Sequence, residues 1–364
     1  MVMSLPDLNH EPSTQWKLRD MLSLQITKRT RVFSPFRGFD TLRNMSKKRT
    51  IDAFFTPPAK QRKVDDDEIH EKPTVVFNHH TYPFPISALP APIDRELASL
   101  PATEGRVFND QLDLDLLYFE PYFPRDTAKD FFNFLRSNLP FYRVKYTIKR
   151  FGVETQINTP RYTTVFGLDE TSHFSEDGSI VDAKSGVKVP SSAYARYAPR
   201  PIPKCLDDLR RSTEAATGCS FNFCLVNYYS SGSDSISYHS DDERFLGVDP
   251  AIASFSFGAR RDFLMKHKPL PPSEQQTNTP EPKPLKLPLG SGDMILMRGK
   301  TQSCWLHSIP KRTGKNEKDG GRINITFRRA MVKGGTDNYY NYNVGTGPIY
   351  RWDKDAQEMK LRNA

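Results

Sequence analysis

From about residue 106, the chain is a succession of short strand-like runs separated by turn residues. The runs are rich in β-branched and aromatic side chains, and several alternate polar with apolar positions. The clearest runs are 221–229, 252–257, 262–266, 293–297 and 322–328. Many short strands with few helices are typical of a sandwich or a jelly-roll barrel. We therefore expect a mainly β domain with flanking helices.

Other segments depart from this strand pattern. Residues 127–139 predict an amphipathic helix, because Phe131, Phe132 and Leu135 fall on one side of it. The segments 168–190 and 269–288 are polar, and the second is rich in proline, which favours loop insertions.

The tail of the chain, 331–364, carries an aromatic cluster. We treat 336–364 as a C-terminal extension of unassigned role. We expect its aromatic rings to pack against the domain rather than to stack on bases. The members of the cluster are Tyr339, Tyr340, Tyr342, Tyr350 and Trp352.

The first 105 residues have a different composition. They show no sustained periodicity, and they contain basic clusters, an acidic run and many prolines. The whole chain is only 37% hydrophobic with 29 prolines, and its mean hydropathy of −0.62 is low for a chain that is globular throughout. We therefore expect a disordered N-terminal arm over 1–105 and one folded domain over 106–335.

The charge of the chain indicates what kind of partner it has. The formal net charge is +9 and the isoelectric point is about 9.2, which favours a polyanion such as nucleic acid over a neutral partner. A merely soluble basic protein is the alternative. The four cysteines form no CxxC pair, so we do not expect a zinc knuckle. We expect an intracellular protein with reduced thiols. No signal peptide is evident, and no apolar run reaches the ~18 residues that span a bilayer.

A metal site is indicated by two residues at the end of a predicted strand. His239 and Asp241 are two residues apart, so on a strand they share a face and can reach one ion. His307 is the best candidate for a third ligand, because two imidazoles and one carboxylate form the facial triad of non-haem iron(II) oxygenases. A bare HxD frame also arises by chance. His267 is a rival ligand, but Lys266 and Lys268 flank it, so we expect a surface residue there.

An anion-binding strand is indicated by strict alternation over 322–328. Arg322, Asn324, Thr326 and Arg328 face one side, and apolar residues face the other. An ordinary amphipathic strand with a solvated polar face is one interpretation. A dicarboxylate site is the other, because each guanidinium can bind a carboxylate with two hydrogen bonds. On a second strand, Asn227 and Tyr229 share a face and could each donate to the same acid.

Taken in chain order, these motifs resemble one known family. Asn227-Tyr228-Tyr229, His239-Ser240-Asp241, His307 and the run Arg-Ile-Asn-Ile-Thr-Phe-Arg at 322–328 are similar to the AlkB dioxygenases. Further stretches are similar to the eukaryotic AlkB homologue that acts on double-stranded DNA, namely 160–163, 239–243, 253–258 and 261–263. The resemblance covers roughly 115–330. It implies a double-stranded β-helix (jelly-roll) barrel with a nucleotide-recognition lid at about 141–200.

The resemblance also implies roles for individual residues. His239, Asp241 and His307 would hold Fe(II). Arg328 and Asn227 would bind the C1 end of 2-oxoglutarate, and Arg322, Asn324 and Tyr229 would bind its C5 carboxylate. Five residues are expected at the base or the DNA, and among them Asp242 would contact the damaged base and Tyr197 would stack on it. The five are Asp242, Glu243, Phe151, Arg161 and Tyr197.

The implied activity is oxidative removal of alkyl groups from DNA bases such as 1-methyladenine and 3-methylcytosine, with Fe(II), 2-oxoglutarate and O₂. These bases are cationic, and the charge of Asp242 would attract them. The base must leave its stack to reach the iron. Phe151 resembles the hydrophobic finger that fills the resulting gap, so a duplex substrate is expected. The alternatives are the same chemistry on RNA, a non-catalytic DNA-bound adaptor, and an iron oxygenase acting on protein or a small molecule.

The arm carries three signals of its own. Residues 48–55 resemble a sliding-clamp-binding box, in which Ile51, Phe54 and Phe55 would enter an apolar pocket; a chance apolar cluster is the alternative. The basic clusters 47–49 and 60–63 resemble a bipartite nuclear signal. Residues 21–44 bear arginines and almost no acids, so initiation at Met21 would give a mitochondrial form. Met45 is another candidate start. We expect a monomer.

Overall fold

The computed structural model divides the chain into two units, Met1–Pro73 and Thr74–Ala364. The predicted clamp-binding box and the nuclear and mitochondrial signals all lie outside the described residues. The structure describes residues 75–143, 145–150, 153–194, 197–270, 280–312, 320–344 and 347–362.

The second unit begins earlier than the sequence predicted. Residues 75–105 contain strands β1 (Val76–Phe77) and β2 (Ile86–Ser87) and helix α1 (Ala91–Leu97). Ile86, Ile93 and Leu97 are buried in the main hydrophobic core. The expected disordered arm over 1–105 is therefore wrong for 75–105. The proline-rich sequence hid a segment that is ordered by packing against the domain rather than by its own periodicity.

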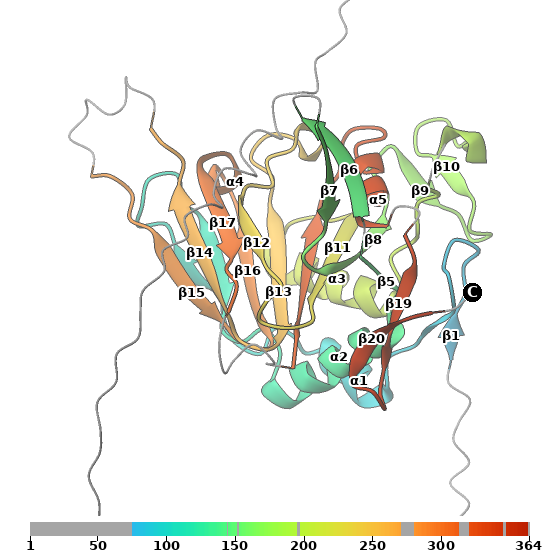
Figure 1. Cartoon of the computed structure of the whole chain (residues 1–364), viewed down its shortest axis with the longest axis horizontal. Helices are drawn as coiled ribbons and strands as arrows, with labels where there is room; N and C mark the ends of the chain where they lie inside the picture. Colours follow the sequence, from blue (N-terminus) through green and yellow to red (C-terminus); the bar gives the residue numbers. More distant parts are fainter. Residues whose placement is uncertain are drawn as a thin grey trace, which may run out of the picture. The chain divides into compact units, whose positions relative to one another are not determined.

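Two large sheets form the main body of the domain, as far as the described residues show (Figure 1). Among the described residues, the larger sheet has ten strands in the order β20-β19-β5-β8-β11-β18-β13-β16-β4-β3. Neighbouring strands in it are antiparallel. Its strands are β3 (Arg106–Phe108), β4 (Leu116–Phe119), β5 (Phe141–Tyr142), β8 (Tyr162–Gly167), β11 (Phe223–Tyr229), β13 (Ile252–Gly258), β16 (Asp293–Met297), β18 (Arg322–Arg328), β19 (Ile349–Asp353) and β20 (Glu358–Leu361).

The smaller sheet supplies the second layer. Within the described part of the chain its order is β12-β17-β14-β15, with β12 (Ile236–His239), β17 (Trp305–Ile309), β14 (Arg261–His267) and β15 (Leu285–Leu289). The prediction of a loop over 269–288 was wrong for its last residues, since these belong to β15 and pair with β14. Pro288 is tolerated in β15 because the strand lies at the edge of the sheet, where a missing N–H breaks no ladder.

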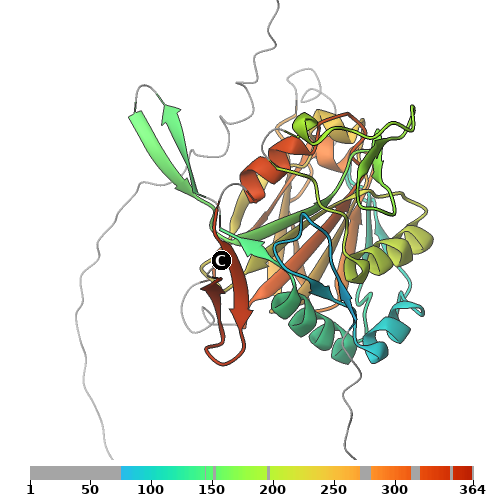
Figure 2. The same ribbon diagram turned by 90° about the vertical axis from the view of Figure 1, so that its right-hand side faces the viewer.

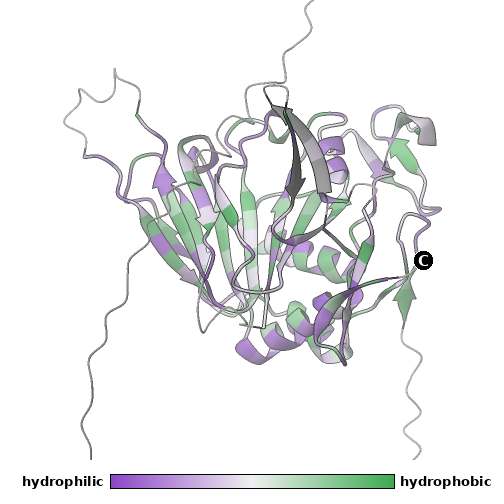
Figure 3. Ribbon diagram, in the orientation of Figure 1, coloured by the Kyte–Doolittle hydropathy of each residue, from purple (hydrophilic) through white to green (hydrophobic). Residues whose placement is uncertain are grey.

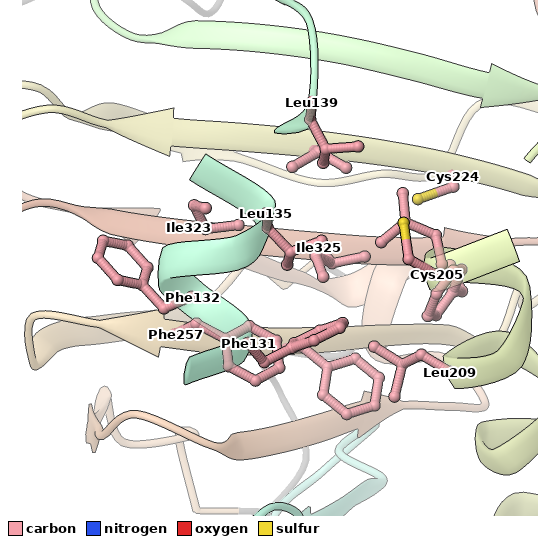
Figure 4. Close-up of a cluster of buried hydrophobic side chains, with 14 of the residues drawn as sticks. Phe131, Phe132, Leu135, Leu139, Cys205, Leu209, Cys224, Phe257, Ile323 and Ile325 are labelled. Carbon is pink, nitrogen blue, oxygen red and sulfur yellow. The ribbon is translucent and has the colours of Figure 1, made fainter. Parts of the chain in front are cut away.

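Two long helices cover the outer face of the larger sheet (Figure 1). α2 (Arg125–Asn138) matches the predicted helix and buries Phe131, Phe132 and Leu135. α3 (Lys204–Thr217) was not predicted, although Pro203 precedes it and Gly218 ends it in the left-handed conformation, with φ 69°. Figure 4 shows side chains of α2 and α3 in one apolar cluster with Ile323 and Ile325 of β18. Among the described residues there are also the short helices α4 (Thr301–Cys304) and α5 (Asp337–Asn343) and two 3-10 turns, Ser191–Ala193 and Arg244–Leu246.

The larger sheet separates two apolar clusters. Ile323, Ile325 and Phe327 of β18 belong to the cluster under the helices. A second cluster lies between the sheets and includes Tyr229, Met265 and Trp305. Apolar colour accordingly runs along the strands of both sheets in Figure 3. The mainly β, jelly-roll expectation is confirmed, and the alternation along β18 places its polar residues between the two sheets.

The region expected to form a lid, about 141–200, contains both hairpins and a strand of the core. β6 (Lys145–Arg150) and β7 (Val153–Asn158) form a hairpin that stands out from the rest of the domain in Figure 2. β9 (Ser172–Phe174) and β10 (Ile180–Asp182) form a second hairpin, so the segment 168–190 is not simply a loop. β8, however, is buried along its whole length and pairs with β11, so residues 162–167 belong to the core and not to a lid.

The C-terminal extension is part of the domain. β19 pairs with β5, and β20 pairs with β19. Tyr340 is buried, Tyr339 lies against Phe223 with a centroid separation of 5.2 Å, and Trp352 lies under the guanidinium of Arg136 at 3.7 Å. The expected packing of the aromatic cluster is confirmed for these residues.

Candidate metal centre and anion pocket

Three potential metal ligands meet where β12 and β17 pair. His239 is opposite His307 in that pairing, and Asp241 follows two residues after His239. Asp241 Oδ1 is 3.9 Å from His239 Nε2, and Asp241 Oδ2 is 3.7 Å from His307 Nε2. The three donor atoms all lie within 4.8 Å of one another. The structure thus brings together the three residues that the sequence selected.

The protonation states of these residues suit a metal. His239 Nδ1–H donates to the carbonyl of Ser237 at 2.8 Å, which leaves the Nε2 lone pair directed at Asp241. Burial lowers the pKa of both imidazoles, that of His307 to about 3, so both rings are neutral at physiological pH. Burial alone would raise the pKa of Asp241, but the positive charge of Arg328 outweighs it and the pKa falls. Two neutral imidazoles and a carboxylate are the ligand set of a facial triad, which fits Fe(II).

The polar face of β18 is buried rather than solvated. Arg322 is 1% exposed and Arg328 is 2% exposed, and Asn324 and Thr326 between them are also buried. The interpretation as an ordinary amphipathic strand is therefore wrong. A buried guanidinium costs free energy unless it is paired, so this row of side chains is built for an anion.

Arg322 has the capacity for such an anion. Its Nη2 donates to Ser256 Oγ at 2.6 Å. Among the described residues, its Nε and Nη1 have no hydrogen-bond partner. Burial lowers the pKa of Arg322 to about 10. A bound carboxylate would supply the opposite charge that stabilises the buried guanidinium.

Further groups surround the Arg322 end of this row. The ring of Tyr229 lies between two guanidiniums, 5.3 Å from that of Arg322 and 5.7 Å from that of Arg261. Arg261 is completely buried and was not predicted as a site residue, although it begins one of the stretches that carry the AlkB resemblance. Asn324 donates to Ser254 Oγ at 2.9 Å and to the carbonyl of Phe255 at 2.7 Å.

The other end of the row lies at the metal ligands. Arg328 Nη2 is 3.1 Å from Asp241 Oδ2. Arg328 Nη1 donates to the hydroxyl of Tyr339, which in turn donates to Glu243 Oε1 at 2.7 Å. Arg328 Nε and Glu243 Oε2 have no hydrogen-bond partner within the described ranges. Tyr339 comes from the C-terminal extension, and nothing in its local sequence indicated this position.

Two other contacts hold the centre in place. The amide nitrogen of Asp241 donates to Gln302 Oε1 at 3.1 Å, so α4 supports the metal-binding strand end. Arg161 Nε donates to Asn227 Oδ1 at 2.8 Å, and its charge acts on both His239 and Asp241. Gln302 had no signal in the sequence that distinguished it from other polar residues of the loops.

The structure describes two of the remaining residues that were predicted to contact the base, Asp242 and Tyr197. Asp242 follows the triad carboxylate and forms an ion pair with Lys268, with Nζ and Oδ2 3.1 Å apart. Tyr197 packs on the edge of a third cluster, which includes Tyr340. Phe151 lies outside the described residues, between β6 and β7. Ile51, Phe54 and Phe55 also lie outside them.

His267 is not a surface residue, and that prediction was wrong. Its side chain is only 8% exposed, and its Nε2 is 3.4 Å from Asp113 Oδ2. The flanking lysines gave a misleading signal because neighbours on a strand point to the opposite face. His267 instead pairs with Trp305 across β14 and β17 and lies edge-on to its ring.

Comparison with known proteins agrees with this geometry. Residues 115–328 match the 2OG-Fe(II) oxygenase superfamily, and this stretch contains the triad and the buried anion row. The chain therefore belongs to the 2OG-Fe(II) oxygenase superfamily. Its relatives narrow this class to AlkB proteins, and the resemblance inferred from the motifs is confirmed.

Three relatives illustrate the match. The DNA oxidative demethylase ALKBH2 of Arabidopsis thaliana is 33% identical over 229 residues, which are 60% of this chain and 67% of the relative. The human alpha-ketoglutarate-dependent dioxygenase alkB homolog 3 is 42% identical over 138 residues, 37% of this chain and 46% of the relative. The human DNA oxidative demethylase ALKBH2 is 37% identical over 135 residues, 37% of this chain and 49% of the relative. The chain thus spans about half the length of the two human relatives.

The helices give no indication of a membrane span. Of those in the described part of the chain, none combines the length and the apolar character that crossing a bilayer requires.

Proposed function

We propose that this protein is an Fe(II)- and 2-oxoglutarate-dependent demethylase that repairs N-alkylated bases in DNA. The single observation that carries the proposal is the row of buried donors that begins at the triad with Arg328 and ends at Arg322. Guanidiniums at both ends of one strand suit a ligand with a carboxylate at each end, and 2-oxoglutarate is such a ligand. Arg322 Nε and Nη1, which lack a hydrogen-bond partner among the described residues, support this assignment.

Different residues along this row would bind the metal and the two ends of 2-oxoglutarate. His239, Asp241 and His307 would hold the metal and leave positions open for cosubstrate and O₂. Arg328 and Asn227 would bind the C1 end of 2-oxoglutarate beside the metal. Its C5 carboxylate would be bound by Arg322, Asn324 and Tyr229. When bound, Fe(II), 2-oxoglutarate and O₂ supply the oxidation of the N-alkyl carbon, which side chains alone cannot perform.

DNA as the substrate is supported by the names of two relatives, the DNA oxidative demethylases of Arabidopsis thaliana and of human. The charge of +9 favours the same polyanion. Bases such as 1-methyladenine and 3-methylcytosine are cationic, and the acids beside the triad favour a cation. Asp242 and Glu243 would face the base, while Arg161 and Tyr197 would contact the base or the strand.

A duplex preference rests on the β6–β7 hairpin. Arg150 and Val153 pair at its end, so Phe151 and Gly152 form the link between the two strands in the sequence. An apolar ring at this position would fill the gap left by a flipped base and recover part of the unstacking cost, about a few kcal/mol. Single strands need no such ring, because their bases are already accessible.

Three other functions remain as outcomes of the test. RNA presents the same phosphates, so charge does not separate it from DNA. A non-catalytic DNA-bound adaptor is disfavoured by the complete donor set and by the buried row. An oxygenase for protein or small molecules is disfavoured by the acids beside the triad.

We further propose that the protein acts as a monomer in the nucleus, with Ile51, Phe54 and Phe55 docking on the sliding clamp. Basic clusters in the arm support nuclear entry, and initiation at Met21 would supply a mitochondrial form. These proposals rest on the sequence of the arm.

The decisive experiment compares three substrates of one sequence, each with a single 1-methyladenine: single-stranded DNA, duplex DNA and RNA. Succinate formation and loss of the methyl group are measured together, with unmethylated strands and the Asp241→Ala variant as controls. We expect turnover on DNA, faster on the duplex. Turnover on RNA alone would mean that RNA and not DNA is the substrate. No turnover on any of the three substrates would refute the demethylase assignment.

A further inference from the structure

A second group of potential metal ligands lies at the end of β14, apart from the triad. It contains Asp113 from the segment between β3 and β4, His267 at the end of β14, and Cys304 at the end of α4. One donor atom of each, a carboxylate oxygen, an imidazole nitrogen and a sulfur, lies within 4.8 Å of the other two. None of the three belongs to the iron site or to the anion row.

The orientation of His267 is that of a metal-binding imidazole. Its Nδ1–H donates to the carbonyl of Lys268 at 2.6 Å, so in the neutral ring Nε2 carries the lone pair. That lone pair faces Asp113 Oδ2 at 3.4 Å, and a carboxylate oxygen is also an acceptor. Two acceptors face each other stably only with an added proton or a cation between them. A backbone carbonyl that fixes the opposite ring nitrogen is the usual support of a histidine ligand.

The elements that carry the three residues are joined by hydrogen bonds. The amide of Lys268 donates to the carbonyl of Cys304 at 2.7 Å, which fixes the end of β14 beside the end of α4. Trp305 Nε1 donates to the carbonyl of Leu112 at 3.1 Å, which holds the residue before Asp113. The separation of Nε2 and Oδ2, 3.4 Å, is close to the ~3.4 Å between nitrogen and oxygen ligands of one tetrahedral zinc ion.

We propose that Asp113, His267 and Cys304 bind a zinc-type transition metal ion, with water as the fourth ligand. A thiolate selects against Mg²⁺ and Ca²⁺, and the mixed sulfur, nitrogen and oxygen set is one that zinc accepts. Without a metal the thiol is protonated, because burial raises the pKa of Cys304 to about 11, and binding would release that proton to solvent.

The position of this site gives it a structural role. Cys304 is three residues before His307, and α4 leads directly into β17. The same short helix contains Gln302, which accepts a hydrogen bond from the amide of Asp241. A metal that ties α4 to the Asp113 segment would therefore stiffen the support of both the distal histidine and the carboxylate of the triad.

A lysine competes for one ligand. Lys300 Nζ is 3.5 Å from Asp113 Oδ1, the oxygen that does not face His267, and its side chain is 66% exposed. Such an exposed ion pair is weak and its lysine can turn to solvent. Removing this lysine should tighten metal binding about two- to fivefold, a gain that partial unfolding cannot produce.

The test uses Co²⁺ as a spectroscopic substitute for zinc on the full chain. A thiolate bound to Co²⁺ absorbs in the near ultraviolet, whereas the triad has no sulfur ligand and gives no such band. We expect the band in the wild type and in the Asp241→Ala variant. Cys304→Ser should abolish it, and His267→Ala should weaken Co²⁺ binding at least about tenfold.

Matched variants separate the site from general effects. Cys219→Ser replaces another half-buried cysteine that lies outside the cluster and should leave the band intact. Lys300→Met should strengthen it at limiting Co²⁺. Circular dichroism without metal shows whether each variant is folded. A wild type without the band, or a band that persists in folded Cys304→Ser, would overturn the proposal.

Discussion

Arg328 forms an ion pair with Asp241, with Nη2 and Oδ2 3.1 Å apart. The first residue is the proposed contact of the 2-oxoglutarate C1 end and the second is a proposed iron ligand. Both are buried, so their attraction is poorly screened. Arg328 thereby keeps Asp241 ionised for the metal, while its Nε remains available to a cosubstrate. Substitutions at either residue should consequently affect metal and cosubstrate together.

The triad itself gives the first prediction. His307→Ala should abolish demethylation and weaken iron binding while the fold survives, because His307 is neutral and its removal leaves no unpaired charge. Iron binding is measured by equilibrium dialysis, and folding by circular dichroism. His239→Ala should behave in the same way. Near-normal turnover by His307→Ala would exclude it as a ligand.

Arg322 provides the second prediction. Arg322→Met should leave the stability of the cosubstrate-free protein unchanged or slightly higher, since a buried charge with unpaired donors is replaced by an apolar chain of similar length. The same variant should lose the thermal stabilisation that 2-oxoglutarate with Mn²⁺ gives the wild type. Thermal unfolding with and without ligand measures both effects. Equal stabilisation of wild type and variant by 2-oxoglutarate would show that Arg322 does not bind it.

Tyr339 provides the third prediction. Tyr339→Phe removes the hydroxyl between Arg328 and Glu243 but keeps the ring that packs on Phe223 and Phe245. We expect a loss of stability of about 1–3 kcal/mol and a raised KM for 2-oxoglutarate, because the buried Arg328 and the half-buried Glu243 each lose a partner. Urea unfolding and steady-state kinetics measure these changes.

A double-mutant cycle tests the origin of the effect. If the hydroxyl acts through Glu243, the effects of Tyr339→Phe and Glu243→Gln should not be additive. Strict additivity in the cycle would mean that the hydroxyl and the carboxyl act independently.

The β6–β7 hairpin gives the fourth prediction. Phe151→Ala should slow repair of duplex substrates much more than of single strands, because only the duplex needs a ring to fill the gap. Val153→Ala is the matched control, since Val153 lies in the same hairpin and is 64% exposed. The duplex-to-single-strand rate ratio is measured for all three proteins. A ratio that Phe151→Ala leaves unchanged removes the duplex assignment but not the demethylase assignment.

The N-terminal arm gives the fifth prediction. Replacing Phe54 and Phe55 with Ala should abolish recovery of the sliding clamp in a pull-down, because aromatic anchors carry most of the binding energy in such interfaces. Catalysis on short DNA should be unaffected. Clamp recovery equal to that of the wild type would mean that 48–55 is a chance apolar cluster.

Local patterns in the sequence determined much of this protein. Alternation over 322–328 and the HxD frame at 239–241 are period-two signals, and a strand places such residues on one face whatever surrounds it. The helix at 127–139 was predicted from the 3.6-residue period of its apolar side chains, and the five strand runs from their β-branched and aromatic residues between turn residues. The motifs in their order, rather than composition, identified the family, because charge and hydropathy alone fit many basic proteins.

Only the tertiary structure decided which faces are buried and which distant residues meet. The polar face of β18 could have been solvated, but the second sheet covers it and buries its polar side chains. Arg261 and Tyr339 reach these side chains from segments far away in sequence, and His267 meets Asp113 and Cys304. Such contacts depend on how the sheets stack and on where the chain returns after each loop. The periodicity of a single strand or helix predicts neither the stacking of the sheets nor the path of the chain after a loop. It shows only which side chains share a face, and not what packs against that face.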